Sequence, residues 1–153
     1  MSRLDPFRPA ADGPTGLFLD TSGLFAYFHP ATAEHEDARA FLSAVGENRL
    51  PYRPLVTNTY VVDELATLLL SKGSHERACT ALERTLDSEE VTVLPETDER
   101  FADAREGFER YDDHDISFTD HLIASHMREE SVTHVFAYDG DFETLGFEQL
   151  PRE

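Results

Sequence analysis

The chain has 153 residues, of which 31 are acidic and 13 basic, giving a net charge of −18 at pH 7, and 40% of the residues are hydrophobic. These values indicate one globular domain with its own core, and the apolar runs are too short to cross a membrane. The single cysteine, Cys79, excludes an internal disulfide and a cysteine-based zinc cluster, and we expect it to be a small buried side chain.

The acidity has two interpretations. An acidic surface repels nucleic acid in dilute buffer, but in molar salt the Debye length falls to about 3 Å and the repulsion is largely screened. Lys72 is the only lysine. Because an acidic, lysine-poor composition resembles that of halophilic proteins, we favour adaptation to high salt over a surface that binds a basic partner.

Strands and helices alternate along the chain behind an N-terminal leader. Residues 1–15 are polar and rich in proline and glycine and lack the pattern of a signal peptide, so we expect a flexible leader followed by one domain at 16–153. Strands are expected at 17–20, 55–56, 91–94, 134–138 and 147–150. Helices are expected at 22–27, at 34–45, from a cap at Asn58 or Thr59 to 71, from a cap at Ser74 to 86, at 98–111, at 119–130 and at 142–145, with a charged connector at 112–115.

This alternation predicts an α/β fold with a mostly parallel sheet. In such folds, ligands bind beyond the carboxyl ends of the strands. Asp20 and Asp139 are each the first acid after an expected strand. We therefore expect both carboxylates at the same edge of the sheet.

Four acids next to apolar segments are candidate site residues, and each also has a structural interpretation. Asp20 suits a helix N-cap, and Asp139 belongs to an Asp-Gly-Asp turn. Asp120 suits a capping box with Ser117. Glu64 suits a solvated helix surface, and the helical wheel does not choose between it and the neighbouring Asp63.

Taken together, the acids indicate a metal site. Carboxylates that cluster raise one another's pKa, so a tight group requires a cation, and Mg²⁺ and Mn²⁺ prefer carboxylate oxygens. Such a site suits metal-assisted hydrolysis of a phosphodiester. His121 and His126 are five apart in a helix and do not share a face, so we expect them at the surface or the edge of the core. The candidate phosphate contacts, which the sequence does not rank, are Arg53, Arg105, Arg110 and Arg128.

Four stretches, "LFLDTSGLFAYF", "VTNTYVVDELATLL", "ISFTDHLIASHM" and "THVFAYDGDFETLGF", resemble in order and spacing the motifs of PIN-domain nucleases, in particular the toxin ribonucleases of VapBC toxin–antitoxin pairs. The resemblance runs from about Leu17 to Leu150. It implies a three-layer α/β/α sandwich with a mostly parallel central sheet and a Mg²⁺- or Mn²⁺-dependent endoribonuclease activity. It also assigns the catalytic, metal-binding acids to Asp20, Glu64, Asp120 and Asp139.

The resemblance implies supporting roles for three more residues. Thr21 is expected to orient Asp20 or a water on the metal, Thr119 to act similarly on Asp120, and Asp141 to assist. Two features depart from the family pattern: the leader is longer than usual, and Ala137 stands where relatives often carry threonine.

The resemblance further implies an RNA substrate, a cognate antitoxin, a homodimer and a cytoplasmic protein without membrane association. Two alternatives stay open. One is a catalytically silent PIN-like binding module, and the other is a housekeeping RNA-processing nuclease, although a single cysteine excludes the cysteine-based zinc ribbon that such relatives often carry.

Overall fold

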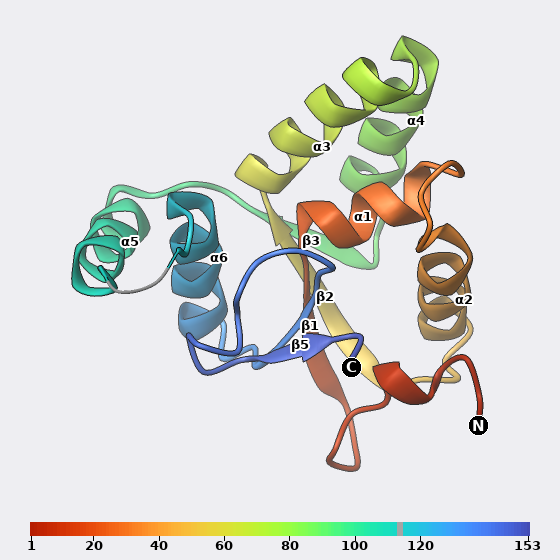
Figure 1. The fold of residues 1–153 in the computed structure, drawn as a ribbon, viewed down its shortest axis with the longest axis horizontal. Coiled ribbons are helices and arrows are strands. Elements are labelled where there is room, and N and C mark those ends of the chain that lie inside the picture. Colours follow the sequence, from red (N-terminus) through yellow and green to blue (C-terminus); the bar gives the residue numbers. More distant parts are fainter. Residues whose placement is uncertain (113–114) are drawn as a thin grey trace.

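The computed structural model describes residues 1–112 and 115–153, and within them five strands form one parallel sheet in the order β3-β2-β1-β4-β5 (Figure 1). The predicted parallel α/β fold is confirmed. The strands are β1 (Thr15–Leu19), β2 (Tyr52–Asn58), β3 (Val91–Leu94), β4 (His134–Phe136) and β5 (Glu148–Leu150). The helices are α1 (Thr21–Phe28), α2 (His35–Gly46), α3 (Thr59–Lys72), α4 (His75–Leu86), α5 (Asp98–Arg110) and α6 (Phe118–Glu129), preceded by a 3-10 turn, η1 (Asp5–Phe7).

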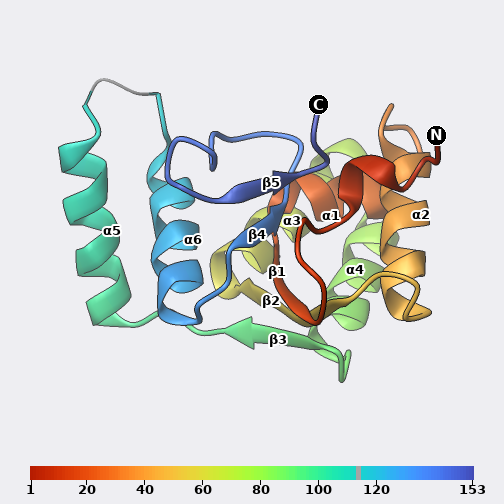
Figure 2. The ribbon, with the colours of Figure 1, turned by 90° about the horizontal axis from the view of Figure 1, so that it is seen from below.

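Helices cover both faces of the sheet, as the expected three-layer arrangement requires. Figure 2 shows α5 and α6 on one side of the strands and α1 and α2 on the other. Helix α3 packs against α4 and also contacts α1. Because both faces are covered, the central strand β1 is apolar throughout its second half, and Leu17, Phe18 and Leu19 are at most 2% exposed.

The strand register brings the carboxyl ends of β1, β2 and β4 to one edge of the sheet. Leu17 pairs with Leu55 on one side and with His134 on the other. The chain leaves β1 at Asp20, enters α3 directly after β2, and turns at residues 138–141 after β4. The parallel sheet therefore delivers three acid-bearing segments to the same place.

The helix starts follow the capping chemistry that the sequence predicts. Asn58 Oδ1 accepts a hydrogen bond from Val61 N, and Ser74 Oγ accepts one from Arg77 N. Ser117 Oγ likewise accepts from Asp120 N at 3.1 Å, which confirms the predicted cap of α6.

The expected flexible leader is wrong for the residues around η1. Leu4 is 9% exposed and Phe7 is 1% exposed, and the Phe7 ring stacks on Phe41 with the ring centres 4.3 Å apart. Phe41 in turn meets Phe136 of β4 with the centres at 4.9 Å. The leader thus supplies an aromatic side chain to the core between α2 and the sheet.

Two further expectations are wrong. Residues 142–145 form turns instead of a helix, and the segment ends at Gly146, which takes a positive φ. Cys79 is exposed, since the buried side of α4 consists of Ala78, Ala81 and Thr85. The charged connector expected at 112–115 includes residues 113–114, which lie outside the described residues.

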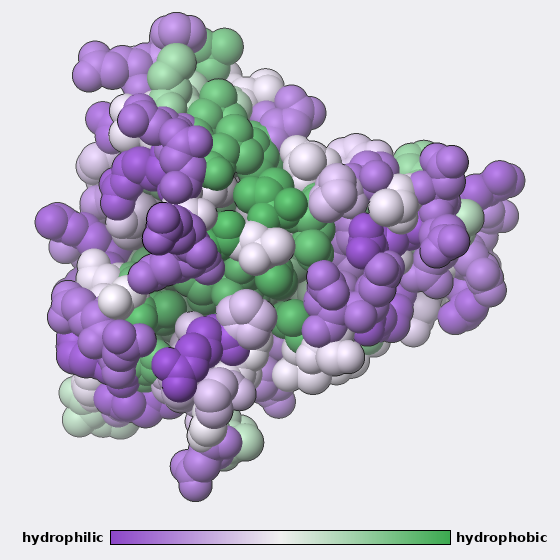
Figure 3. All heavy atoms as spheres, turned by 180° about the vertical axis from the view of Figure 1, so that it is seen from behind, coloured by the Kyte–Doolittle hydropathy of each residue, from purple (hydrophilic) through white to green (hydrophobic). Residues whose placement is uncertain are grey.

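The edge of the sheet formed by β3 lies at the bottom of the view in Figure 2. Seen from behind, in Figure 3, an apolar band crosses this face between strongly hydrophilic surfaces. Within the described ranges, none of the helices is long and apolar enough to span a membrane.

Candidate active site

Four predicted acids line one cavity of about 660 Å³ at the carboxyl edge of the sheet. They reach it from different elements, because Asp20 follows β1, Glu64 lies in α3, Asp120 lies in the first turn of α6, and Asp139 lies in the turn after β4. Thr21 and Thr119 also line the cavity, as does Lys72. The structure therefore brings together residues that are up to 119 positions apart in the sequence.

Asp20 is both a helix cap and a buried acid. Its carboxylate accepts a hydrogen bond from Ser22 N at 3.3 Å and so caps α1, yet the residue is only 6% exposed. Burial is the main cause that raises the pKa of Asp20 to about 7. The hydrogen bonds from Ser22 offset part of this effect, and the negative charge of Asp120 adds to it. The structural and functional interpretations of Asp20 are thus compatible.

Asp120 lies at the electrostatic centre of the acids. Its pKa is raised to about 6, mainly by burial; the hydrogen bond with Ser117 opposes this, and the charges of Glu64, Asp139 and Asp141 add to it. A close approach of the chain explains part of this effect. Gly140 has a φ of +93°, and a Cβ on it would lie 3.2 Å from Asp120 Oδ2, so the turn carrying Asp139 passes directly beside the Asp120 carboxylate.

Ser22 connects two of these acid-bearing segments, a role that the sequence reasoning missed. Its hydroxyl donates to Asp20 Oδ2 at 2.8 Å and accepts hydrogen bonds from Tyr138 N at 2.9 Å and Asp139 N at 3.1 Å. One hydroxyl therefore fixes the Asp20 carboxylate and the backbone that presents Asp139. The only signal in the sequence is a small polar residue two positions after the first acid.

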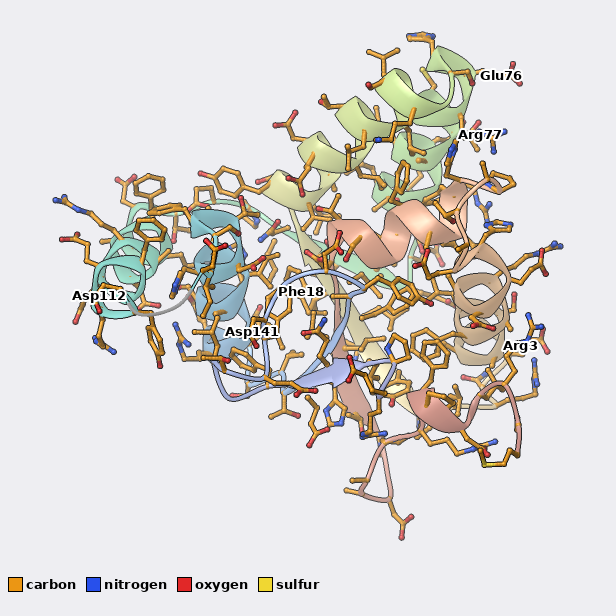
Figure 4. The ribbon with its side chains drawn as sticks, viewed as in Figure 1. Arg3, Phe18, Glu76, Arg77, Asp112 and Asp141 are labelled. Atoms are coloured by element: carbon orange, nitrogen blue, oxygen red, sulfur yellow. The ribbon has the colours of Figure 1, made fainter. Side chains whose placement is uncertain are left out.

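The supporting residues behave differently from one another. Thr21 is 4% exposed, and its Oγ1 has no hydrogen-bond partner among the described residues, whereas the Ser22 hydroxyl donates to the Asp20 carboxylate. Thr119 lines the cavity beside Asp120. Asp141 does not line the cavity, and its carboxylate accepts a hydrogen bond from Thr144 Oγ1 at 2.7 Å. In Figure 4 Asp141 lies near α6, which is consistent with its effect on the pKa of Asp120.

The donor set suits a hard divalent cation, although the side chains stand apart. Among the described residues, no three acids, histidines or cysteines stand close enough to hold a metal ion. Carboxylates without a cation repel one another, and this repulsion adds to the burial that raises the pKa values of Asp20 and Asp120. Four carboxylates and the unpartnered Thr21 Oγ1 offer the oxygen ligands that Mg²⁺ and Mn²⁺ prefer, so the residues fit such an ion in kind and number.

His121 and His126 are buried, and not at the surface or the edge of the core as expected; they are 1% and 0% exposed. Burial lowers the pKa of His126 to about 4, so its ring is neutral at ordinary pH. The His126 Nδ1 lies 2.9 Å from Asn58 Nδ2, which donates to it. This contact ties the start of α3, the helix of Glu64, to α6, the helix of Asp120.

The comparisons with known proteins agree with this geometry. The sequence matches the PIN domain family over residues 17–148. It is 29% identical over 137 residues to the 23S rRNA-specific endonuclease VapC20 of Mycobacterium tuberculosis, which covers 90% of this chain and 99% of that protein.

Solved structures show the same relationship. The crystal structure of M. tuberculosis VapC20, a sarcin-ricin loop cleaving toxin, matches with a TM-score of 0.76 at 29% identity, covering 86% of this chain and 95% of that one. VapBC2 from Rickettsia felis shares the fold, with a TM-score of 0.64 at 14% identity over 88% of this chain and 97% of that one. Because the family match spans nearly the whole chain, this protein belongs to the PIN domain family.

Proposed function

We propose that this PIN-domain protein is a divalent-metal-dependent endoribonuclease that hydrolyses RNA phosphodiesters as the toxin of a toxin–antitoxin pair. The observation that carries the proposal is the convergence of Asp20, Glu64, Asp120 and Asp139 on one cavity. The similarity to a 23S rRNA-specific endonuclease supports the reaction and suggests ribosomal RNA as the first substrate to test.

The protein's own residues prepare the site in two ways. Ser22 holds the Asp20 carboxylate and the turn of Asp139 in fixed relation. The Asn58–His126 contact sets the spacing between the helices of Glu64 and Asp120. We assign the carboxylates of Asp20, Glu64, Asp120 and Asp139 as ligands of Mg²⁺ or Mn²⁺. Such an ion would supply the positive charge that activates water and stabilises negative charge on the phosphate oxygens.

The test is RNA cleavage in molar KCl with Mn²⁺ or Mg²⁺, comparing the wild type with Asp20→Asn. Asparagine caps helices about as well as aspartate, so this variant should fold while losing a charged oxygen ligand. We expect cleavage by the wild type and a loss of about 100-fold or more in the variant. Equal cleavage by both proteins would contradict the assignment.

A calorimetric titration with Mn²⁺ in molar KCl separates this proposal from a silent binding module. The endoribonuclease should bind Mn²⁺ through its acids, and Asp20→Asn should weaken that binding. Absence of Mn²⁺ binding to the wild type would favour the silent module instead.

We also propose two partners that the family resemblance implies: a cognate antitoxin and a second copy of this chain. Light scattering of the purified protein in molar KCl tests the dimer, and a monomer at all concentrations would contradict it. Co-purification with the product of an adjacent small reading frame tests the antitoxin.

A further inference from the structure

A second cavity, of about 490 Å³, lies where the end of α1 meets the starts of α2 and α4. Three arginines line it: Arg39 from α2, and Arg77 and Arg84 from α4. Glu76 is the only acid along its wall among the described residues. With three positive charges against one negative, this cavity is locally basic in a chain of net charge −18.

Among the described residues, these three arginines lack an acidic partner, unlike most of the other arginines. In the part of the chain that the structure describes, eight arginines pair with a carboxylate within 4.0 Å. Of the 12 arginines in the sequence, that leaves Arg39, Arg53, Arg77 and Arg84, and three of these four line the cavity. A guanidinium group without an acidic partner remains available to an external anion.

Local contacts hold two of the guanidinium groups against the cavity wall. Arg77 Nη1 donates to the Phe28 carbonyl at 3.1 Å, and Arg84 Nη2 donates to the Tyr27 hydroxyl at 2.8 Å. The Arg84 guanidinium also lies 5.4 Å from the Tyr27 ring centre and 5.6 Å from that of Phe28. In Figure 4 Arg77 lies at the start of α4 next to the end of α1, and Glu76 points outward. Each guanidinium has five N–H donors, so these contacts orient the groups and leave donors free.

Helix α1 connects this cavity to the acidic one. Asp20 caps its start, and Tyr27 and Phe28 form its last turn. Eight helical residues at 1.5 Å each span about 12 Å, a distance that a short stretch of RNA covers. In high salt, long-range attraction is screened, and the contacts that remain effective are short-range, charge-assisted hydrogen bonds of the kind that arginine makes with phosphate.

We infer that the cavity of Arg39, Arg77 and Arg84 binds a backbone phosphate of the RNA, away from the bond that is cut. The inference rests on the proposed ribonuclease function. The cavity supplies affinity that the acidic remainder of the surface does not, and the rings of Tyr27 and Phe28 beside it suit stacking with an RNA base.

The test variant is Arg39→Gln, because Arg39 lines the cavity, is exposed and makes no ion pair with the described residues. Its matched control is Arg53→Gln, at the candidate phosphate contact that lies outside the cavity, is also exposed and also makes no ion pair with the described residues. The affinity for a short single-stranded RNA is measured by fluorescence anisotropy with EDTA present, so that no cleavage occurs, over a range of KCl concentrations.

We expect Arg39→Gln to weaken RNA binding by about five- to tenfold and to lower the slope of log affinity against log salt by about 0.7, the change for one lost phosphate contact on a single strand. Arg53→Gln should change neither. Glu76→Gln should act in the opposite direction and strengthen binding about two- to threefold, an effect that a purely structural role of the cavity would not produce. In cleavage assays, Arg39→Gln should raise KM and leave kcat unchanged.

The outcomes separate this inference from the proposed function. If cleavage depends on Asp20 while Arg39→Gln and Arg53→Gln bind RNA equally well, the inference is overturned and the ribonuclease assignment stands. If no RNA is cleaved but Arg39→Gln still weakens RNA binding, the phosphate site stands and the catalytic assignment fails. If a polyglutamate peptide shows Arg39-dependent binding and RNA does not, the cavity takes protein carboxylates and the inference is overturned.

Discussion

The two cavities beside α1 carry opposite charges and are built in different ways. In the acidic cavity, Asp20 and Asp120 are gathered by strand and helix ends, partly buried, and raised in pKa. In the basic cavity, Arg39 and Arg84 are exposed and make no ion pair with the described residues. In a chain that is acidic nearly everywhere, the number of acids says little about function. A site is marked instead by where a charge lies and by whether that charge lacks a partner of opposite sign.

The largest expected effect separates the two cavities. Glu64→Gln removes one of the acids lining the acidic cavity, and we expect about a 100-fold or greater loss of metal-dependent RNA cleavage with RNA binding in EDTA unchanged. The control is Asp63→Asn, a change to the adjacent exposed acid of α3 that does not line the cavity. Similar losses of cleavage in both variants would contradict the assignment of Glu64, rather than Asp63, as the acid of α3 that acts in the cavity.

Ser22→Ala acts inside the acidic cavity alone. This variant removes the hydroxyl that donates to Asp20 and that accepts hydrogen bonds from Tyr138 N and Asp139 N. We therefore expect the cleavage rate to fall about 10- to 100-fold, with little change in RNA affinity. Ser43→Ala, in the partly buried face of α2, serves as the control in the same kinetic assay. An unchanged kcat in Ser22→Ala would remove Ser22 from the description of the site.

Gly23→Ala should damage both cavities, because α1 is their common wall. A Cβ at this position would lie 2.7 Å from the Phe136 ring and from its carbonyl oxygen, so α1 must shift away from β4. We expect a loss of about 1–3 kcal/mol in the free energy of unfolding, measured with urea in molar KCl, together with weaker RNA binding and slower cleavage. Gly46→Ala is the control, since a Cβ there meets nothing within 4 Å. Equal stability of the two variants would contradict the tight α1–β4 packing.

The last prediction is a pH dependence of stability that arises in the acidic cavity. Because burial raises the folded-state pKa of Asp20 from 3.8 to about 7, the folded protein binds more protons than the unfolded chain between these values. In EDTA, the free energy of unfolding should therefore fall as pH rises from about 4 to about 7, by up to about 1.4 kcal/mol per pH unit from this group. Urea unfolding of Asp20→Asn should show a shallower slope, and Arg39→Gln should keep the wild-type slope. Parallel slopes for wild type and Asp20→Asn would contradict the burial argument.

Local sequence patterns predict most of the fold. Alternating apolar segments and capping residues such as Asn58, Ser74 and Ser117 locate strands and helix starts because they report the backbone in their own neighbourhood. The packing of Phe7 on Phe41 was not predictable in this way, since 33 residues of chain separate the two rings. Nor was the exposure of Cys79, which depends on which side of α4 meets α3.

The candidate site, like the fold, was predictable only in part from the sequence. The acids follow from their places after strands and at helix starts, together with the family motifs. Of the arginines considered as phosphate contacts from the sequence, Arg105, Arg110 and Arg128 pair with neighbouring acids, and only the structure shows this. Arg39 and Arg84 come together only through the packing of α2 and α4 around α1, which no local pattern encodes.

The hydrogen bonds of Ser22 also set an order in which the acidic cavity can form during synthesis. They reach 116 and 117 positions along the chain, and the strand that follows is held in turn by Ala137 N donating to Leu150 O at 3.0 Å. During synthesis, a growing chain that has not yet reached Tyr138 lacks both donors to Ser22 and has no Asp139. The acidic cavity can therefore reach its final arrangement only after residues 138 and 139 have been added to the chain.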